Sequence, residues 1–234
     1  MNADKLGSVS RQDSGFSLPL FVTRENKLLV GAVTFVVAGG VYLISNHYPI
    51  FEPKLLPMTA WDQAIPFIPQ TVWIYVSEYI YFIVIYALCR ETLNMNRYVY
   101  AVLAIQFVSV AIFWAWPTTY PRHLFPLPDT LDSLTYKLFA SLREGDSPNN
   151  CAPSLHVSSV LLCAFLFFNE QREKLWFFLT WGAMISLSTL TTKQHYIVDV
   201  VSGLMMAILF HWLFYRRISY HEPRTTGHAT SPVS

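Results

Sequence analysis

Two residues near the end of the sequence have the types and spacing of a catalytic pair. His195 and Asp199 are four residues apart, so on a helix they would share one face. A carboxylate that accepts the Nδ1 proton of an imidazole fixes its tautomer and leaves Nε2 free to attack an electrophile. The alternative is a pair that only caps and orients the helix. We therefore predict His195 as a nucleophile and Asp199 as the group that orients it.

A second polar group, residues 151–156, opens an apolar run. Pro153 is favoured in the first turn of a helix, and Ser154 can cap its start. A helix N-terminus offers free N–H groups and the positive end of the helix dipole, so it attracts anions such as phosphate. His156 would lie in that turn, beside a bound anion. The alternative for His156 is an interfacial histidine that hydrogen-bonds a loop.

Positive charge beside these groups comes from Arg122, in a third polar group at residues 118–123, and from Lys193. A transferring phosphoryl group needs positive charge at its oxygens, and an arginine can bind two of them at once. The alternatives are a solvated loop residue for Arg122 and a contact with lipid headgroups for either cation. Arg122 and Lys193 are therefore candidates for binding phosphate oxygens beside His156.

The composition indicates that membrane helices position these groups. Of the 234 residues, 53% are hydrophobic and 13% are charged, about half the charged share of an ordinary soluble domain. Aromatic residues reach 16%, which is typical of proteins with many side chains at membrane interfaces. The net charge of +1 provides no basic surface for nucleic acid, so we expect no nucleic-acid partner.

Six apolar runs predict six transmembrane helices, because a span needs about 20 mostly apolar residues. The runs cover approximately residues 28–45, 72–88, 98–116, 155–168, 175–191 and 197–215. The fourth run is short, so we expect its helix to begin a few residues earlier. The predicted fold is an all-α membrane domain over residues 27–216. A cytoplasmic segment, 1–26, precedes it, and a polar, disordered cytoplasmic tail, 217–234, follows it.

The distribution of Lys and Arg predicts the orientation of these helices. With both termini in the cytoplasm, eleven basic residues fall inside and five outside, in line with the positive-inside rule. The outer five are Lys54, Arg122, Lys137, Arg143 and Lys193. All three polar groups then face the non-cytoplasmic side, which would be periplasmic for a bacterial inner-membrane protein or lumenal otherwise.

Two outer segments connect these helices. Residues 48–71 are rich in Pro and aromatic residues, and we expect them to lie at the membrane interface. Residues 117–153 form a long outer loop with several prolines, and loops of that length usually carry function. Both segments are therefore expected beside the predicted site.

Two motifs together resemble the type 2 phosphatidic acid phosphatase (PAP2) superfamily. Pro-Ser-Leu-His occupies residues 153–156, and Ser188, His195 and Asp199 have the spacing of the family motif Ser-Arg-x5-His-x3-Asp. The motifs occur in the family's order and on one predicted membrane side, and the resemblance covers roughly residues 70–215. It implies a membrane enzyme that cleaves a lipid phosphate ester and needs neither metal nor cofactor.

The resemblance also implies a role for each residue. His195 would take the phosphoryl group as a phosphohistidine, and Asp199 would orient it. His156 would protonate the leaving alkoxide and then activate the acceptor. Ser188, as the first residue of the last motif, would lie at the phosphate-binding site. Arg122, Lys193 and Ser154 would hold the phosphate there. The expected partners are a lipid phosphate or phospholipid substrate and the surrounding membrane lipids.

The sequence departs from the phosphatase motifs at three positions. Thr189 stands at the Arg of the last motif, Ala115 at the Lys of the first, and His123 at its Pro. The form Pro-Ser-Leu-His with His-Tyr-x-x-Asp is similar to the branch that contains inositol phosphorylceramide and sphingomyelin synthases. Those enzymes transfer a phosphate-bearing headgroup, so a headgroup transferase is the alternative to a phosphatase.

Three other functions are alternatives to these. Two His and an Asp are also good metal ligands, but no fourth ligand is clear and the nearby cations disfavour a metal. A transporter would use charges within the spans, for which Glu78 and Gln106 are the polar candidates. Glu78 lies towards the outer face and was also considered as part of the site. A non-catalytic assembly protein would need none of these residues.

Overall fold

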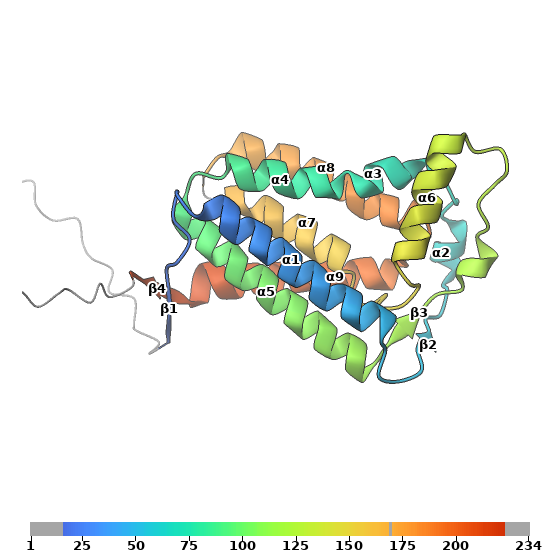
Figure 1. Cartoon of the computed structure of the whole chain (residues 1–234), viewed down its shortest axis with the longest axis horizontal. Coiled ribbons are helices and arrows are strands. Elements are labelled where there is room, and N and C mark those ends of the chain that lie inside the picture. The colour runs from blue at the N-terminus through green and yellow to red at the C-terminus, as the bar shows by residue number, and fades with distance from the viewer. Residues whose placement is uncertain (1–15, 169, 223–234) are drawn as a thin grey trace, which may run out of the picture.

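The computed structural model describes residues 16–168 and 170–222, and the chain is mostly helical (Figure 1). The main helices are α1 (Lys27–His47), α2 (Ala60–Ala64), α3 (Val72–Val76), α4 (Glu78–Leu88), α5 (Thr92–Ala115), α6 (Ser133–Gly145), α7 (Leu155–Ala164), α8 (Arg172–Thr191) and α9 (Ile197–Trp212). Short helical turns cover Pro69–Thr71, Arg122–Leu124, Phe165–Phe167 and Leu213–Arg217. Short strands are β1 (Ser17–Pro19), β2 (Lys54–Leu55), β3 (Thr118–Thr119) and β4 (Ser219–His221).

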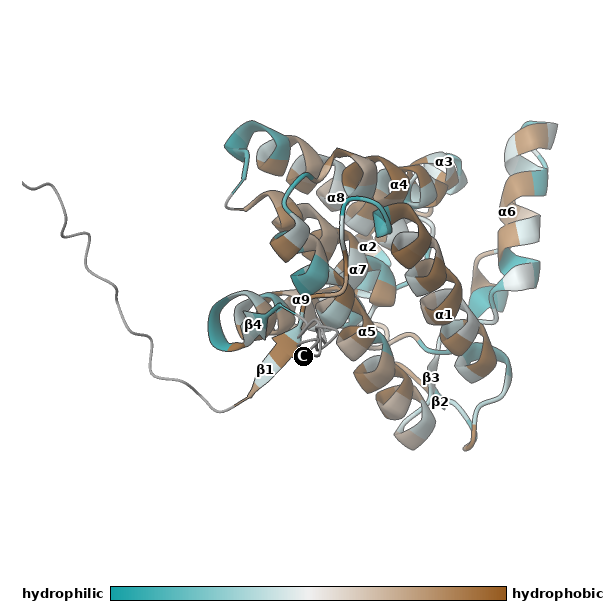
Figure 2. Cartoon of the chain, turned by 60° about the vertical axis from the view of Figure 1, so that its left-hand side comes forward, coloured by the Kyte–Doolittle hydropathy of each residue, from teal (hydrophilic) through white to brown (hydrophobic). Residues whose placement is uncertain are grey.

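Four helical stretches in the described part of the chain are long and apolar enough to cross a membrane. They are Lys27–His47, Pro69–Leu88, Thr92–Ala115 and Ile197–Arg217. The other two predicted spans also form helices, but Leu155–Phe167 is shorter, and α8 carries several Trp, Thr and Ser residues that make it less apolar. Figure 2 shows hydrophobic residues along α1, α4, α5 and α7, with hydrophilic residues concentrated at the ends.

Helix α7 lies at the centre of the bundle, where it packs against α4, α5, α8 and α9. The fully buried Tyr81 of α4 ties three of these helices together, because its hydroxyl lies 2.7 Å from the carbonyl of Val160 in α7 and 3.2 Å from that of Phe178 in α8. Gly203 of α9 lies directly against the Ser154 carbonyl, with no room for a Cβ atom. This close approach holds the start of α7 beside the start of α9.

The two ends of the bundle differ in what they carry. At one end β1 pairs in parallel with β4, so the described ends of the chain lie together (Figure 1). At the opposite end lie α2, α6, the parallel pair of β2 and β3, and the starts of α7 and α9. The predicted cytoplasmic segment, 1–26, and the predicted tail, 217–234, are described only in part. Residues 1–15 and 223–234 lie outside the described residues, and β1 and β4 lie in the described parts of these two segments.

Helix α6 occupies the middle of the segment expected to be an irregular outer loop. Asp132 caps its start by accepting hydrogen bonds from the backbone N–H groups of Leu134 and Thr135, which favours helix formation here. Thr135 and Phe139 are buried against the bundle, and Trp73 of α3 donates a 3.0 Å hydrogen bond to the Thr135 hydroxyl. The helix therefore crosses the end of the bundle beside the predicted site (Figure 1).

Candidate active site

His195 and Asp199 are in contact, but they do not share one face of a helix as expected. His195 lies in the turn before α9, and Asp199 lies in the first turn of that helix. The Asp199 Oδ2 atom accepts the backbone N–H of Tyr196 at 2.9 Å and lies 3.3 Å from Nδ1 of His195. Helix capping therefore aims the carboxylate at the imidazole, as the prediction of an orienting group requires.

This pair of side chains is buried. Asp199 is 1% exposed and His195 is 8% exposed. The second oxygen of Asp199, Oδ1, has no hydrogen-bond partner among the described residues. Because an isolated buried charge is costly, the imidazole of His195 is the side chain positioned to interact with this carboxylate.

A tight turn presents His195 to this end of the bundle. The backbone N–H groups of Gln194 and His195 both donate to the carbonyl of Thr189, at 3.0 and 3.1 Å. Lys193 adopts a left-handed backbone with φ of 56°, which is uncommon for a residue other than glycine. These bonds close the end of α8 and fix the direction in which His195 leaves it.

His156 lies opposite His195, with ring centroids 5.6 Å apart. Ser154 caps α7 by accepting the Val157 N–H at 3.4 Å, which places His156 in the first turn as predicted. The Nε2 atom of His156 lies 2.5 Å from the Tyr75 hydroxyl and 3.3 Å from Oε1 of Glu78. Each of the two histidines therefore has a carboxylate partner.

Arg122 lies beside the His195 turn but is already well bonded. Its Nη2 atom donates to the carbonyl of Asp146 at 2.7 Å and to Oε1 of Gln194 at 3.4 Å. Its Nη1 donates to the Arg143 carbonyl at 2.7 Å, and its Nε to the Tyr120 hydroxyl at 3.0 Å. These contacts hold the guanidinium in place and, among the described residues, leave one Nη1 proton without an acceptor.

Lys193 is held by a different segment of the chain. Its Nζ donates to the carbonyls of Asp62 and Ile65, at 2.7 and 2.6 Å, and the residue is 4% exposed. Burial lowers the pKa of this ammonium, and the nearby Asp62 carboxylate partly offsets that effect. Asp62 also accepts the backbone N–H of Ile197 at 2.8 Å. Lys193 and Asp62 thus fasten the α8–α9 turn to α2.

The serines contribute mainly through the backbone. The Ser188 hydroxyl donates to the Ile185 carbonyl at 2.6 Å within α8, and its carbonyl accepts from Thr192. The backbone N–H of Ser154 donates to the Asp199 carbonyl at 3.1 Å, which ties the two motif helices directly. Ser188 therefore stabilises the turn that follows α8, whereas Ser154 lies at the end of α7 that faces both histidines.

Comparison with known families agrees with this geometry. A family model described as the PAP2 superfamily matches residues 58–213, which is most of the chain and includes both histidines, Asp199 and Glu78. The chain belongs to the PAP2 superfamily. A search of curated proteins found no match to the sequence. Membership supports a phosphatase-type phosphoesterase.

Three residues near this PAP2 site were not predicted from the sequence. Tyr75 could not be recognised as a site residue from the sequence, because it resembles any other aromatic residue at a membrane interface. Gln194 accepts from Tyr120 and Arg122, and its own Nε2 donor has no partner in the described residues. Arg143 of α6 had been counted only for its charge. Its Nε and Nη2 atoms are buried and, within residues 16–168 and 170–222, unpartnered.

The Arg position of the last PAP2 motif is occupied by Thr189, which is fully buried, with its hydroxyl bonded to the Ser186 carbonyl. Arg143 of α6 lies beside Arg122, whose Nη1 binds its carbonyl. The Arg143 guanidinium packs over the rings of Phe139 and Phe67, at 4.6 and 5.7 Å from their centroids. In the described part of the chain, no three His, Cys, Asp or Glu side chains are grouped to hold a metal ion.

Proposed function

We propose that this protein is a membrane lipid phosphatase or phosphotransferase that works through a phosphohistidine at His195. One observation carries the proposal: two imidazoles lie edge to face with their ring centroids 5.6 Å apart, and each has its own carboxylate. A nucleophile and a general acid must both reach the same phosphate ester, and this arrangement brings two suitable groups to one place. A pair that only capped a helix would not require a second His–carboxylate pair opposite it.

The first half-reaction follows from this geometry. Asp199 holds the proton on Nδ1 of His195, so the lone pair on Nε2 attacks phosphorus. The phosphorus–oxygen bond to the lipid breaks, and His156 gives its proton to the departing alkoxide. Because Nε2 of His156 contacts Glu78 and Tyr75, Nδ1 is the atom left for this transfer. The products are a free lipid alcohol and a phosphoimidazolium stabilised by Asp199.

The second half-reaction reverses the roles. Neutral His156 accepts a proton from water, and the resulting hydroxide oxygen bonds to phosphorus. The phosphorus–nitrogen bond breaks, its electron pair returns to His195, and inorganic phosphate leaves. The free Nη1 proton of Arg122, the open donors of Arg143 and the N-terminal amides of α7 would bind the phosphate oxygens. Lys193 and Ser188 would keep the His195 turn in place.

We further propose six membrane spans within residues 27–216, with both termini cytoplasmic and the site on the opposite side. Two observations support this: the described chain ends lie together at the end away from the site, and the basic residues are concentrated at that end. With the protein expressed in a bacterial inner membrane, a cysteine at the exposed Asp129 should react with an impermeant maleimide in intact cells. Labelling only after the cells are permeabilised would contradict this orientation.

A headgroup transferase of the inositol phosphorylceramide synthase type is the second candidate. Thr189 and Ala115, in place of motif cations, favour it. Lipid mass spectrometry of cells carrying wild type or His195→Ala separates the two. A lipid alcohol and phosphate that depend on His195 indicate a phosphatase, and a new headgroup-bearing phospholipid indicates a transferase. If no lipid changes, both enzymatic assignments fail, and a transporter becomes the better account.

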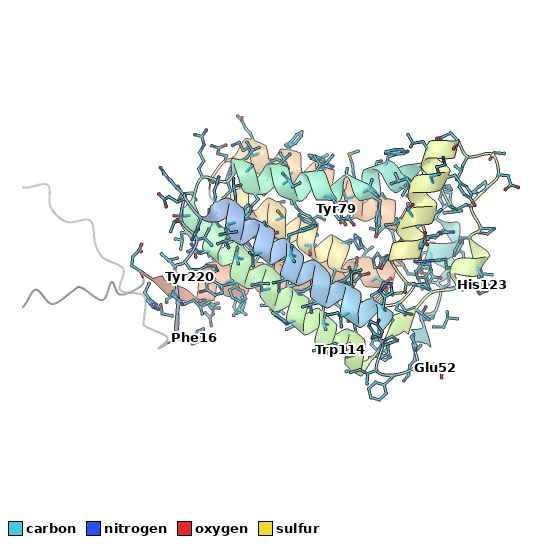
Figure 3. All side chains as sticks on the ribbon, in the orientation of Figure 1. Phe16, Glu52, Tyr79, Trp114, His123 and Tyr220 are labelled. Carbon is cyan, nitrogen blue, oxygen red and sulfur yellow. The ribbon has the colours of Figure 1, made fainter. Side chains whose placement is uncertain are left out.

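Glu78 should act as a positioning residue for His156. Replacing it by Gln keeps the size of the side chain but removes the charge that orients and stabilises the imidazole. We expect kcat for a lipid phosphate to fall about 100-fold, which is part of what a general acid contributes. Glu52→Gln, at an exposed position of the same end (Figure 3), should retain full activity. Equal activity of both variants would remove Glu78 from the mechanism.

A further inference from the structure

A long cavity of about 530 Å³ leads away from the candidate active site, between α1 and α4. His156 and Glu78 line one end of it, and Leu28 and Ala87 line the other. Its remaining walls come mainly from apolar side chains of α1, α4 and α5. The cavity therefore connects the reacting groups to a mostly apolar groove along the bundle.

The packing of α1 explains why the cavity exists. Helix α1 packs against α5, whereas α4 packs against α7 and α8, which leaves a groove between α1 and α4. Most of α1 is exposed, so the groove lies along a lipid-facing side of the bundle. Phe35 bridges it by an edge-to-face contact with Tyr79, which is labelled in Figure 3, with the ring centroids 6.3 Å apart. Near the far end the Tyr86 ring lies directly against Gly31.

The length of the groove suits a hydrocarbon chain. From Tyr42, at the site end of α1, to Leu28 there are fourteen residues, or about 21 Å of helix. One leaflet contributes roughly half of the ~30 Å hydrocarbon core of a bilayer. The groove therefore extends somewhat further than the chain of a lipid whose headgroup lies at the surface.

We infer that this groove binds an acyl chain of the substrate lipid while its phosphate ester lies between His156 and His195. The inference rests on the proposed function and adds where the lipid is held. The continuity of the groove with His156 and its apolar walls favour this occupant over a soluble phosphate ester. Gln106 lines the groove and its Nε2 donor has no partner in the described residues, so it is available to a carbonyl or hydroxyl oxygen of the lipid.

Two adjacent glycines offer a matched test. A Cβ atom at Gly39 or at Gly40 would have open space around it, but only Gly39 lines the groove. Gly39→Phe should fill the groove and raise KM for dioleoyl phosphatidic acid about 10-fold, equivalent to losing the burial of about two methylene groups. Its activity on p-nitrophenyl phosphate should change less than about twofold, and Gly40→Phe should resemble wild type on both substrates. Equal effects of the two variants on phosphatidic acid would overturn the inference.

A binding measurement separates the groove from the proposed function. The His195→Ala chain is mixed with phosphatidic acid that carries a photoreactive diazirine in mid-chain, and the cross-linked peptides are sequenced. Cross-links to α1 and α4 that Gly39→Phe removes and Gly40→Phe keeps would support the groove, even if the wild type hydrolysed no phosphate ester. Cross-links confined to other helices would overturn the groove, whatever the catalytic activity.

Discussion

Substitution of His195 by Ala is expected to lower kcat for lipid phosphate cleavage by about 10⁴-fold or more, as when a covalent nucleophile is removed from other enzymes. The imidazole forms the bond to phosphorus, and no neighbouring group at this position can replace it. Asp199, the partner of His195, is held by the N–H of Tyr196 as well, so the helix end should survive the change. Phosphate release by purified variants in detergent measures the effect.

His123 provides the control for this substitution. It lies at the same end of the molecule, is exposed, and is labelled in Figure 3. His123→Ala should keep wild-type activity, and the thermal unfolding of His195→Ala should stay within a few degrees of wild type. A His195→Ala protein that folds normally and retains a tenth of the activity would exclude His195 as the nucleophile.

Substitution of His156 by Ala should have an effect that depends on the leaving group. A lipid alkoxide is a poor leaving group and needs a proton, so kcat on phosphatidic acid should fall about 10²–10⁴-fold. The p-nitrophenolate ion leaves without a proton, so formation of the phosphohistidine from p-nitrophenyl phosphate should be nearly unchanged. A burst of p-nitrophenol, followed by slow turnover, is therefore expected from rapid-mixing absorbance.

The opposite pattern would assign a different role to His156. If the p-nitrophenol burst disappeared along with lipid cleavage, His156 would act before or during attack rather than on the leaving group. Tyr75→Phe is the companion variant, because it removes the hydroxyl at Nε2 and leaves Glu78 in place. It should reduce lipid cleavage far less than His156→Ala does.

Local spacing was enough to predict several features of this site. The contact between His195 and Asp199 follows from four residues of separation, although helix capping rather than a shared face produces it. The cap at Ser154 follows from residue type, and the PAP2 resemblance drawn from the two motifs is confirmed for the superfamily. Each of the six apolar runs coincides with helix in the structure, and four of these stretches are long and apolar enough to span a membrane.

Features that depend on distant contacts could not be predicted. Tyr75 and Glu78 reach His156 from helices about 80 residues away in sequence. Lys193 was expected at the phosphate because of its charge, but its ammonium binds carbonyls at Asp62 and Ile65, more than 125 residues earlier. Helix α6 could not be predicted because its amphipathic pattern is short and polar residues alternate with apolar ones along it. Only packing decides which partners such residues meet.

Trapping the covalent intermediate tests the central claim most directly. Wild type is mixed for milliseconds with ³²P-labelled substrate, quenched in alkali to preserve phosphohistidine, and digested for mass spectrometry. The account predicts label on the peptide that contains His195, and a longer-lived label in His156→Ala with p-nitrophenyl phosphate. Substrate turnover with no labelled protein, or with label on a residue other than His195, would contradict it.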